Sequence, residues 1–297
     1  MSAPDILCIG SVHWDIIGRS AATLRIGSDE PGRITRLPGG VALNIAVTLA
    51  RLGLTPALLT AIGRDIDGDA LVAACGQLGL VTSHVYRPDG LPTDRYMAIE
   101  GANGMIAAIA DTHSLEAAGD KILLPLADGA LNCNKYPFAG TIALDGNLTA
   151  RMFAEIAVSP LFAAADLRVA AAGTGKAERL APLLTHPRAT LYMNLAEAGI
   201  LCRTGFDNAA LAARALVQQG AARVLITDGS RTCADGARSQ GVITNRPPLV
   251  QVARVTGAGD TFMAAHIVAE RRGDDRATAL AAALGAAAAY VAGEVGT

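Results

Sequence analysis

The chain has 297 residues, a formal net charge of −2 and a pI near 6.2. This length supports a large hydrophobic core, and no stretch has the composition of a linker, so we expect one domain over residues 1–297. Because the charge gives no basic surface, we do not expect a polymeric nucleic acid or a membrane as partner. The expected partner is a small molecule.

The five cysteines are scattered and form no C-x-x-C pair, which is typical of a reducing compartment. The first residues carry no basic segment followed by a long apolar stretch, so we expect a cytoplasmic protein. The most apolar tract, residues 277–293, consists mainly of alanine and is interrupted by Gly285 and Tyr290. It is expected to form a buried helix and not a membrane span.

Short apolar runs recur along the chain, and each is typical of a strand buried on both faces of a parallel sheet. They cover residues 6–10, 57–62, 141–145, 190–193 and 223–227. Helical patterns alternate with them at residues 42–52, 68–78, 150–157, 176–184, 209–219 and 260–271. This alternation predicts an α/β fold, a three-layer α/β/α Rossmann-like sandwich with a mostly parallel central sheet. Such sheets bind ligands at the carboxyl ends of their strands.

Two segments break the alternation. Residues 95–111 place Asn103-Gly104 between two apolar stretches, which predicts a β-hairpin. The region before residue 38 is rich in strand and turn signals. We expect about 16–38 and 93–111 to form a small β-sheet lid over the carboxyl edge of the main sheet. Unpaired lid edges would favour a homodimer through the lid.

The segment that is most informative about chemistry is V-A-R-V-T-G-A-G-D-T-F, residues 252–262. Residues 257–259 allow successive backbone N–H groups to converge, and the positive end of a helix beginning near Asp260 would reinforce an anion site. A carboxylate beside such a site would repel the anion unless it activates an attacking hydroxyl. The alternative is a glycine turn followed by an acidic first helical turn.

Residues 256–262 resemble the T-G-A-G-D-[TA]-F signature of ribokinase-like, PfkB-type carbohydrate kinases. The resemblance extends over essentially the whole chain. It implies an ATP-dependent phosphotransferase in which Asp260 is the catalytic base. Gly257, Ala258 and Gly259 would form the anion hole that stabilises the transferring phosphoryl group.

A second segment, residues 38–53, resembles the G-G-x-x-x-N-x-A signature of the same family and implies that Gly39, Gly40 and Asn44 bind the acceptor. Paired glycines permit close backbone approach to a ligand, and an amide both donates to and accepts from hydroxyls. Asp15 matches an early aspartate that binds sugar hydroxyls. The alternatives are a helix start with an incidental asparagine, and a turn or cap role for Asp15.

Asn194-x-x-Glu197 resembles the N-x-x-E motif, which implies that these residues organise Mg²⁺ and phosphate through water. An asparagine cap followed by a glutamate is the alternative. Thr227 and Gly229 end a predicted strand where the family contacts ATP, and Thr256 is expected to contribute to the same ATP site.

Residues 93–111, 145–148 and 176–180 resemble stretches of pseudouridine kinases, so the expected reaction phosphorylates the 5′-hydroxyl of pseudouridine. A sugar or sugar-phosphate kinase of the same family is an alternative, and Arg33, Arg36 and Arg95 could then hold an acceptor phosphate. A non-catalytic sugar- or nucleoside-binding protein is an alternative of another class.

The chain also departs from these relatives. Many carry Asp-Thr before the T-G-A-G-D core and use that aspartate in a K⁺ site, whereas this chain has Arg254-Val255. A guanidinium there should repel the ion, so K⁺ is not expected to be required. Leu43 stands where pseudouridine kinases often have arginine, and Ala170-Ala171 stands where they tend to be acidic. Both departures weaken the assignment of the substrate.

Overall fold

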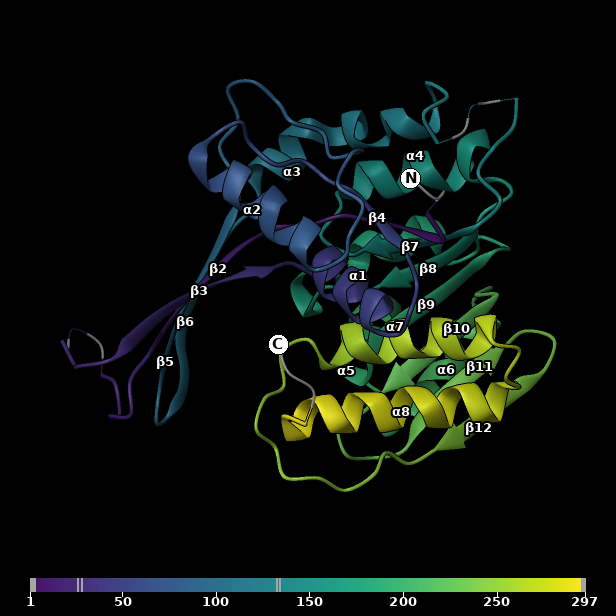
Figure 1. The fold of residues 1–297 in the computed structure, drawn as a ribbon. Helices are drawn as coiled ribbons and strands as arrows, with labels where there is room; N and C mark the ends of the chain where they lie inside the picture. The colour runs from purple at the N-terminus through teal and green to yellow at the C-terminus, as the bar shows by residue number, and fades with distance from the viewer. Residues whose placement is uncertain (1–3, 26, 28, 132, 134, 295–297) are drawn as a thin grey trace.

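The computed structural model describes residues 4–25, 27, 29–131, 133 and 135–294, so positions 26 and 28 of the expected lid lie outside the described residues. The strands of its main sheet are β1 (Ile6–Ile9), β4 (Pro56–Leu59), β7 (Thr141–Asp145), β8 (Asp166–Ala170), β9 (Ala189–Asn194), β10 (Arg223–Thr227), β11 (Cys233–Ala237) and β12 (Gly241–Asn245). Their order is β12-β11-β10-β9-β8-β7-β1-β4 (Figure 1). All neighbours from β10 to β4 are parallel, and β11 and β12 add an antiparallel edge.

Helices cover both faces of this sheet. One face packs against α3 (His113–Ala118), α4 (Ala150–Val158), α5 (Leu195–Cys202), α6 (Ala209–Gln218) and the 3₁₀ helices η1 (Gly119–Leu126), η2 (Pro160–Phe162) and η3 (Thr174–Leu183). The other face packs against α1 (Val41–Arg51), α2 (Ile66–Gln77), α7 (Ala258–Arg271) and α8 (Arg276–Ala292). Because side chains alternate along a strand, Leu7 and Ile9 enter the first core while Ile6 and Cys8 enter the second. The predicted three-layer α/β fold is confirmed.

A separate small sheet extends from the body, on the left in Figure 1. Its strands are β2 (His13–Arg19), β3 (Arg33–Gly39), β5 (Arg95–Gly101) and β6 (Gly104–Asp111), in the order β3-β2-β5-β6. The hairpin turn falls on Ala102-Asn103, one residue earlier than the Asn-Gly pattern predicted, because Gly101 and Gly104 already pair with each other.

Two elements differ from expectation. Residues 174–183 form 3₁₀ turns and not an α-helix, and Pro182 within them has no N–H to donate to a regular helix. The alanine tract is the helix α8, but Ala277, Ala281 and Ala282 are exposed, so only one side of the helix is buried. No helix among the described residues is both long and apolar enough to cross a membrane.

Ion pairs attach α7 to the sheet. Glu270 on α7 accepts hydrogen bonds from Arg168 of β8 and Arg223 of β10. His266, one turn earlier, lies fully buried with its Nδ1 2.8 Å from the hydroxyl of Tyr192. Burial lowers the pKa of His266 to about 4, so this imidazole is neutral at physiological pH. These contacts fix the helix whose first turn carries Asp260.

Candidate active site

The first turn of α7 places Asp260 at the carboxyl edge of the sheet. Gly257 caps the helix with φ 89°, a left-handed conformation that favours glycine. A Cβ at this position would meet the hydroxyl of Tyr290 at 2.6 Å. Both constraints explain why a glycine precedes this helix.

The amides of this turn are not equivalent. The Ala258 N–H donates to the Val255 carbonyl at 3.0 Å. Within the described part of the chain, the N–H groups of Gly259 and Asp260 make no hydrogen bond to another backbone group. Amides at a helix N-terminus without internal partners can bind an anion.

A cavity of about 750 Å³, here called the main cavity, opens beside this turn. Its polar lining includes Asn194, Glu197, Thr227, Gly229 and Asp260. An apolar wall comes from the segment after β12 and from α8: Pro247, Pro248, Leu249, Val250, Val252, Ala287, Ala288 and Val291. A polar end and an apolar wall are the features expected of a nucleotide site.

The predicted acceptor residues are next to Asp260 but do not line the main cavity. The Asn44 amide on α1 donates to Asp260 Oδ2 at 2.9 Å, across 216 positions of sequence. Asn44 is one helical turn after Gly40, whose carbonyl accepts from the Asn44 N–H. A Cβ on Gly39 would meet the Asp15 carboxylate at 2.3 Å. The structure thus brings Asp15, Gly39, Gly40, Asn44 and Asp260 together.

Burial changes the acidity of Asp260. Removal from bulk water raises its pKa to about 7. The hydrogen bond from Asn44 opposes this shift, and the nearby carboxylates Asp145 and Glu197 add to it. A pKa close to physiological pH is suited to a general base.

Asn194 and Glu197 form a capping box at the start of α5. The Asn194 side chain accepts from the Glu197 N–H at 2.9 Å, and Glu197 Oε2 accepts from the Asn194 N–H at 2.7 Å. Glu197 Oε1 accepts from the Gly173 N–H at 2.9 Å. The motif therefore forms the asparagine cap followed by a glutamate that was the alternative to a Mg²⁺ site. Both residues also line the main cavity.

Glu197 is only 5% exposed, and burial raises its pKa. Its carboxylate, with Asp228 and Asp260, lines the main cavity. No three His, Cys, Asp or Glu side chains among the described residues are grouped closely enough to hold a metal ion directly. Carboxylate oxygens at the edge of a phosphate site suit a hydrated Mg²⁺, which would bind through water and phosphate oxygens.

Thr256 does not line the main cavity, although the sequence places it in the ATP site. Its carbonyl accepts a hydrogen bond from the Tyr290 hydroxyl at 2.9 Å. Arg254 Nε donates to the Tyr290 carbonyl at 2.9 Å, and its guanidinium lies 3.8 Å from the centre of the Tyr290 ring. The end of α8 thereby holds the loop before Gly257 in place.

A buried polar network was not assigned a role from the sequence. Asp145 accepts from the Ser11 N–H at 2.7 Å and from the Asn147 side chain at 2.8 Å, and Asn147 accepts from Lys176. Asp145 ends β7, Ser11 and Asn147 lie two residues after β1 and β7, and Lys176 lies six residues after β8. Polar residues at or soon after the ends of apolar strands were the available signal.

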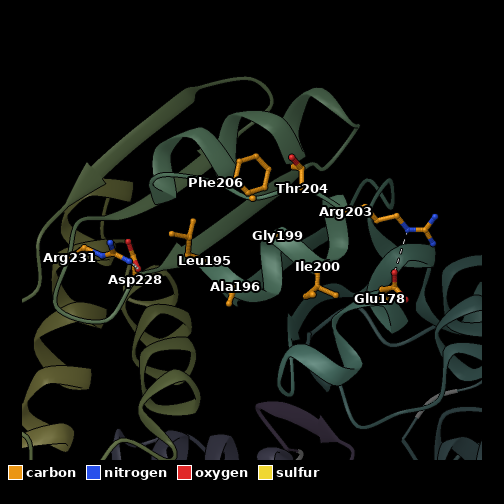
Figure 2. A pocket seen from close by; sticks show the side chains of 11 residues that line it. Glu178, Leu195, Ala196, Gly199, Ile200, Arg203, Thr204, Phe206, Asp228 and Arg231 are labelled. Atoms are coloured by element: carbon orange, nitrogen blue, oxygen red, sulfur yellow. Dashed lines mark hydrogen bonds and ion pairs between the residues drawn. The ribbon is translucent and has the colours of Figure 1, made fainter.

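A second cavity of about 650 Å³ lies along α5 (Figure 2). Leu195, Ile200 and Phe206 give it an apolar lining. An ion pair borders it on each side, Arg203 to Glu178 at 3.4 Å and Arg231 to Asp228 at 2.8 Å. It shares Leu195, Ala196 and Asp228 with the main cavity.

Comparisons with known proteins agree with this geometry. The family model of pfkB carbohydrate kinases matches residues 3–297. An uncharacterized sugar kinase of Escherichia coli (strain K12), YeiI, is 31% identical over 265 residues, which cover 86% of this chain and 69% of the relative. A pseudouridine kinase of the same organism is 36% identical over 107 residues, 36% of this chain and 34% of that protein.

Among solved structures, ribokinase of Arabidopsis thaliana complexed with ribose and ATP superposes with a TM-score of 0.82 at 22% identity. The match covers 100% of this chain and 94% of the ribokinase chain. Kinases of this fold use ATP and Mg²⁺ and act on small-molecule sugars or nucleosides. The chain belongs to the pfkB carbohydrate kinase family and is an ATP-dependent carbohydrate or nucleoside kinase.

Proposed function

We propose that this kinase transfers the γ-phosphate of ATP to the 5′-hydroxyl of a nucleoside, with pseudouridine as the first candidate. The observation that carries the proposal is the position of Asp260. It lines the main cavity and also bonds to Asn44 at 2.9 Å. A phosphoryl donor on one side and an alcohol on the other would meet at this carboxylate.

In this mechanism Asp260 accepts the proton of the acceptor hydroxyl as that oxygen attacks the γ-phosphorus. The N–H groups of Gly259 and Asp260 stabilise the negative charge on the phosphoryl oxygens. Gly257 and Ala258 belong to the same anion hole, and Ala258 contributes once its bond to Val255 opens. Mg²⁺ supplies further neutralisation of phosphate charge when bound.

The remaining predicted residues divide between the two substrates. Asp15, next to Gly39 and Gly40, accepts hydrogen bonds from the ribose diol. Thr227 and Gly229 line the cavity proposed for the nucleotide, and Thr256 supports the adjoining loop through its bond with Tyr290. Asn194 and Glu197 hold the hydrated Mg²⁺. The partial likeness to a pseudouridine kinase supports a nucleoside acceptor.

Of the three arginines named for an acceptor phosphate, Arg36 and Arg95 favour an acceptor without one, while Arg33, opposite Arg19, is on the Asp15 face four positions along the strand. Arg36 and Arg95 both pair with Asp67 on α2, at 2.8 and 2.6 Å. By strand register they lie on the sheet face opposite Asp15, because Arg36 is opposite Ile16 and Arg95 is opposite Trp14. They are therefore not aimed at an acceptor bound by Asp15.

We also propose four features of the working enzyme. The small sheet of β2, β3, β5 and β6 acts as the lid of a single domain, and two chains pair through it. Arg254 fills the position of the relatives' K⁺ site, so K⁺ is not required. The enzyme works in the cytoplasm, consistent with cysteines that are all free in the described structure.

The test is an ATP-consumption assay over nucleosides, free sugars and sugar phosphates, with wild type and Asp260→Asn. We expect pseudouridine to have the highest kcat/KM and Asp260→Asn to lower kcat by about 10²- to 10⁴-fold. A sugar or sugar phosphate that reacts faster than pseudouridine would refute the proposed substrate. Full activity of Asp260→Asn would refute the proposed mechanism.

A further inference from the structure

Helix α1 begins without a side-chain cap of its own. Its N-cap residue is Gly40, which has no side chain to accept from the first amides of the helix. Any other residue is disfavoured here, because Gly40 has φ 108° and a Cβ would meet the Ser11 carbonyl oxygen at 2.3 Å. Close packing of the Gly40 backbone on Ser11 therefore leaves the helix start without its usual cap.

Ser11 supplies the missing cap from 30 positions before the helix. Its Oγ accepts from the N–H of Val41, the first residue of α1, at 3.0 Å. The same oxygen accepts from Asn147 Nδ2 at 3.2 Å and donates to Asp145 Oδ2. A hydroxyl has one hydrogen to donate and two lone pairs that accept, so these three contacts use its full capacity. Alanine could not replace any of them.

Asp145 holds Ser11 in place. Its fully buried carboxylate also accepts from the Ser11 N–H at 2.7 Å, and from the N–H and the side-chain amide of Asn147, both at 2.8 Å. Ser11 is only 1% exposed. Because hydrogen bonds to a charged group are strong, the Ser11 hydroxyl is fixed relative to the ends of β1 and β7. The start of α1 is thereby fixed to the edge of the main sheet.

The position of α1 matters for the acceptor side of the site. Gly39 and Gly40 directly precede the helix, and Asn44 on it donates to Asp260 Oδ2 at 2.9 Å. A shift of the first turn would move the glycine backbone and the Asn44 amide together. Ser11 and Val41 do not line the main cavity, so such a shift should leave the nucleotide side unaffected.

We propose that Ser11 is a positioning residue for the acceptor. Through its bond to the first amide of α1, Ser11 holds Gly39, Gly40 and Asn44 where the acceptor hydroxyl meets Asp260. It acts through the helix and not on the reacting atoms. This inference rests on the proposed function, because that function assigns these three residues to the acceptor.

The test measures KM for pseudouridine and KM for MgATP in two variants. In Ser11→Ala the Val41 amide loses its partner, so KM for pseudouridine should rise about 10-fold while KM for MgATP stays within about twofold. Ser11→Thr keeps the hydroxyl and should recover most of the loss. Ser159→Ala is the matched control and should leave both KM values unchanged. Its hydroxyl also caps a helix start, accepting from the Leu161 N–H at 3.3 Å, but lies before the amino end of β8.

Equal rises in the two KM values would overturn the proposal, because a serine that only stabilises the fold would affect both substrates alike. An unchanged KM for pseudouridine in Ser11→Ala would overturn it too, as would a folded Ser11→Thr no better than Ser11→Ala. If Ser11→Ala fails to fold in a thermal unfolding scan, Ser11→Cys, whose thiol has a similar size but hydrogen-bonds weakly, replaces it with the same expectations.

The proposed substrate and this inference can fail separately. Wild type that phosphorylates a free sugar but no nucleoside would refute the proposed substrate alone. The same variants are then measured with that sugar, and the same difference between the acceptor KM and the MgATP KM is expected. Wild type active on pseudouridine with an unaffected Ser11→Ala would refute this inference alone.

Discussion

Asp260 combines two requirements that oppose each other. A base must be ionised to accept a proton, yet burial beside Asp145 and Glu197 favours the protonated form and raises its pKa to about 7. The hydrogen bond from Asn44 stabilises the ionised form. Asn44 therefore sets the pH range in which this carboxylate can act, in addition to any contact with the acceptor.

This balance gives a prediction for the pH profile. We expect kcat/KM of the wild type to fall below about pH 7, since Asp260 is then protonated. In Asn44→Ala the bond that favours the carboxylate is lost, so the acid limb should move to higher pH. The measurement is kcat/KM from pH 5 to 9 at saturating MgATP. Asn208→Ala, at the start of α6, is the control, and an unmoved limb in Asn44→Ala would contradict the argument.

At the scale of elements, α8 supports the loop before Gly257. Arg254 stacks on Tyr290 at 3.8 Å, and Tyr290 bonds to the Thr256 carbonyl at 2.9 Å. The amides of Ala253 and Arg254 also donate to the Val291 carbonyl at the end of the helix. A guanidinium at this position both supports the loop and repels a free cation.

We therefore expect turnover that does not respond to K⁺. The rate should change less than twofold when KCl replaces choline chloride at constant ionic strength, because the guanidinium charge occupies the region. Tyr290→Phe, which removes the bond to Thr256, should lower kcat while leaving this insensitivity intact. Several-fold activation of the wild type by K⁺ would show that the ion has a site here after all.

A second feature at the scale of elements is Asp67, which joins the small sheet to the body. It pairs with Arg36 of β3 and Arg95 of β5, and its carbonyl accepts from the Trp14 indole at 2.9 Å. Arg36 also lies over the Trp14 ring, 3.9 Å from its centre. Three strands of the small sheet thus depend on one residue of α2.

Asp67→Asn should loosen the small sheet without affecting the chemistry. Because these ion pairs are partly exposed, their loss is expected to cost on the order of 1 kcal/mol, so the acceptor KM should rise about fivefold with little change in kcat. High salt should raise the wild-type KM in the same direction. Glu155→Gln breaks a comparable surface pair with Arg151 on α4 and is the control. An unchanged acceptor KM in Asp67→Asn would show that these ion pairs do not contribute to acceptor binding.

The sequence predicts elements well where one local pattern decides the structure. The apolar runs at β1, β7 and β10 were predicted to within a residue because strands buried on both faces need continuous hydrophobicity. β8, β11 and β12 were missed, since Asp166 and Arg168 interrupt the first, Asp235 and Gly236 interrupt the second, and the third has only two adjacent apolar residues. Each of these charges has an ion-pair partner: Arg168 pairs with Asp166 two residues away and with Glu270 of α7, and Asp235 pairs with Arg223 at 2.7 Å.

In the candidate active site, too, local sequence patterns predict some residues and not others. Motifs with fixed spacing identified Asp260, Asn44 and Glu197, which the fold brings to one edge. The partners that tune them could not be predicted, because the contacts of Lys176 with Asn147 and of Arg254 with Tyr290 join segments 29 and 36 positions apart. Such pairs depend on tertiary packing and leave no periodic pattern in the sequence.

At the scale of the whole molecule, the small sheet presents an exposed apolar surface. Ile34, Met97, Ile99 and Ile109 are 80%, 48%, 46% and 68% exposed. Strand register puts them on one face of the small sheet, because Gly18 is opposite both Ile34 and Ile99 and Met97 is opposite Ile109. Asp15 is on the other face. Adjacent exposed apolar side chains on a projecting sheet favour association with another protein.

We expect a second copy of the chain to cover this face, since a twofold axis through the sheet would bury the same side chains of both copies. Light scattering should give twice the monomer mass of 30.3 kDa. Ile109→Lys should yield monomers, because pairing would bury an uncompensated charge. Val158→Lys, at an equally exposed apolar position on α4, should stay dimeric. A monomeric wild type, or an Ile109→Lys dimer of unchanged affinity, would refute pairing through this face. Since β2 carries Asp15 as well as this face, loss of the dimer should also raise the acceptor KM.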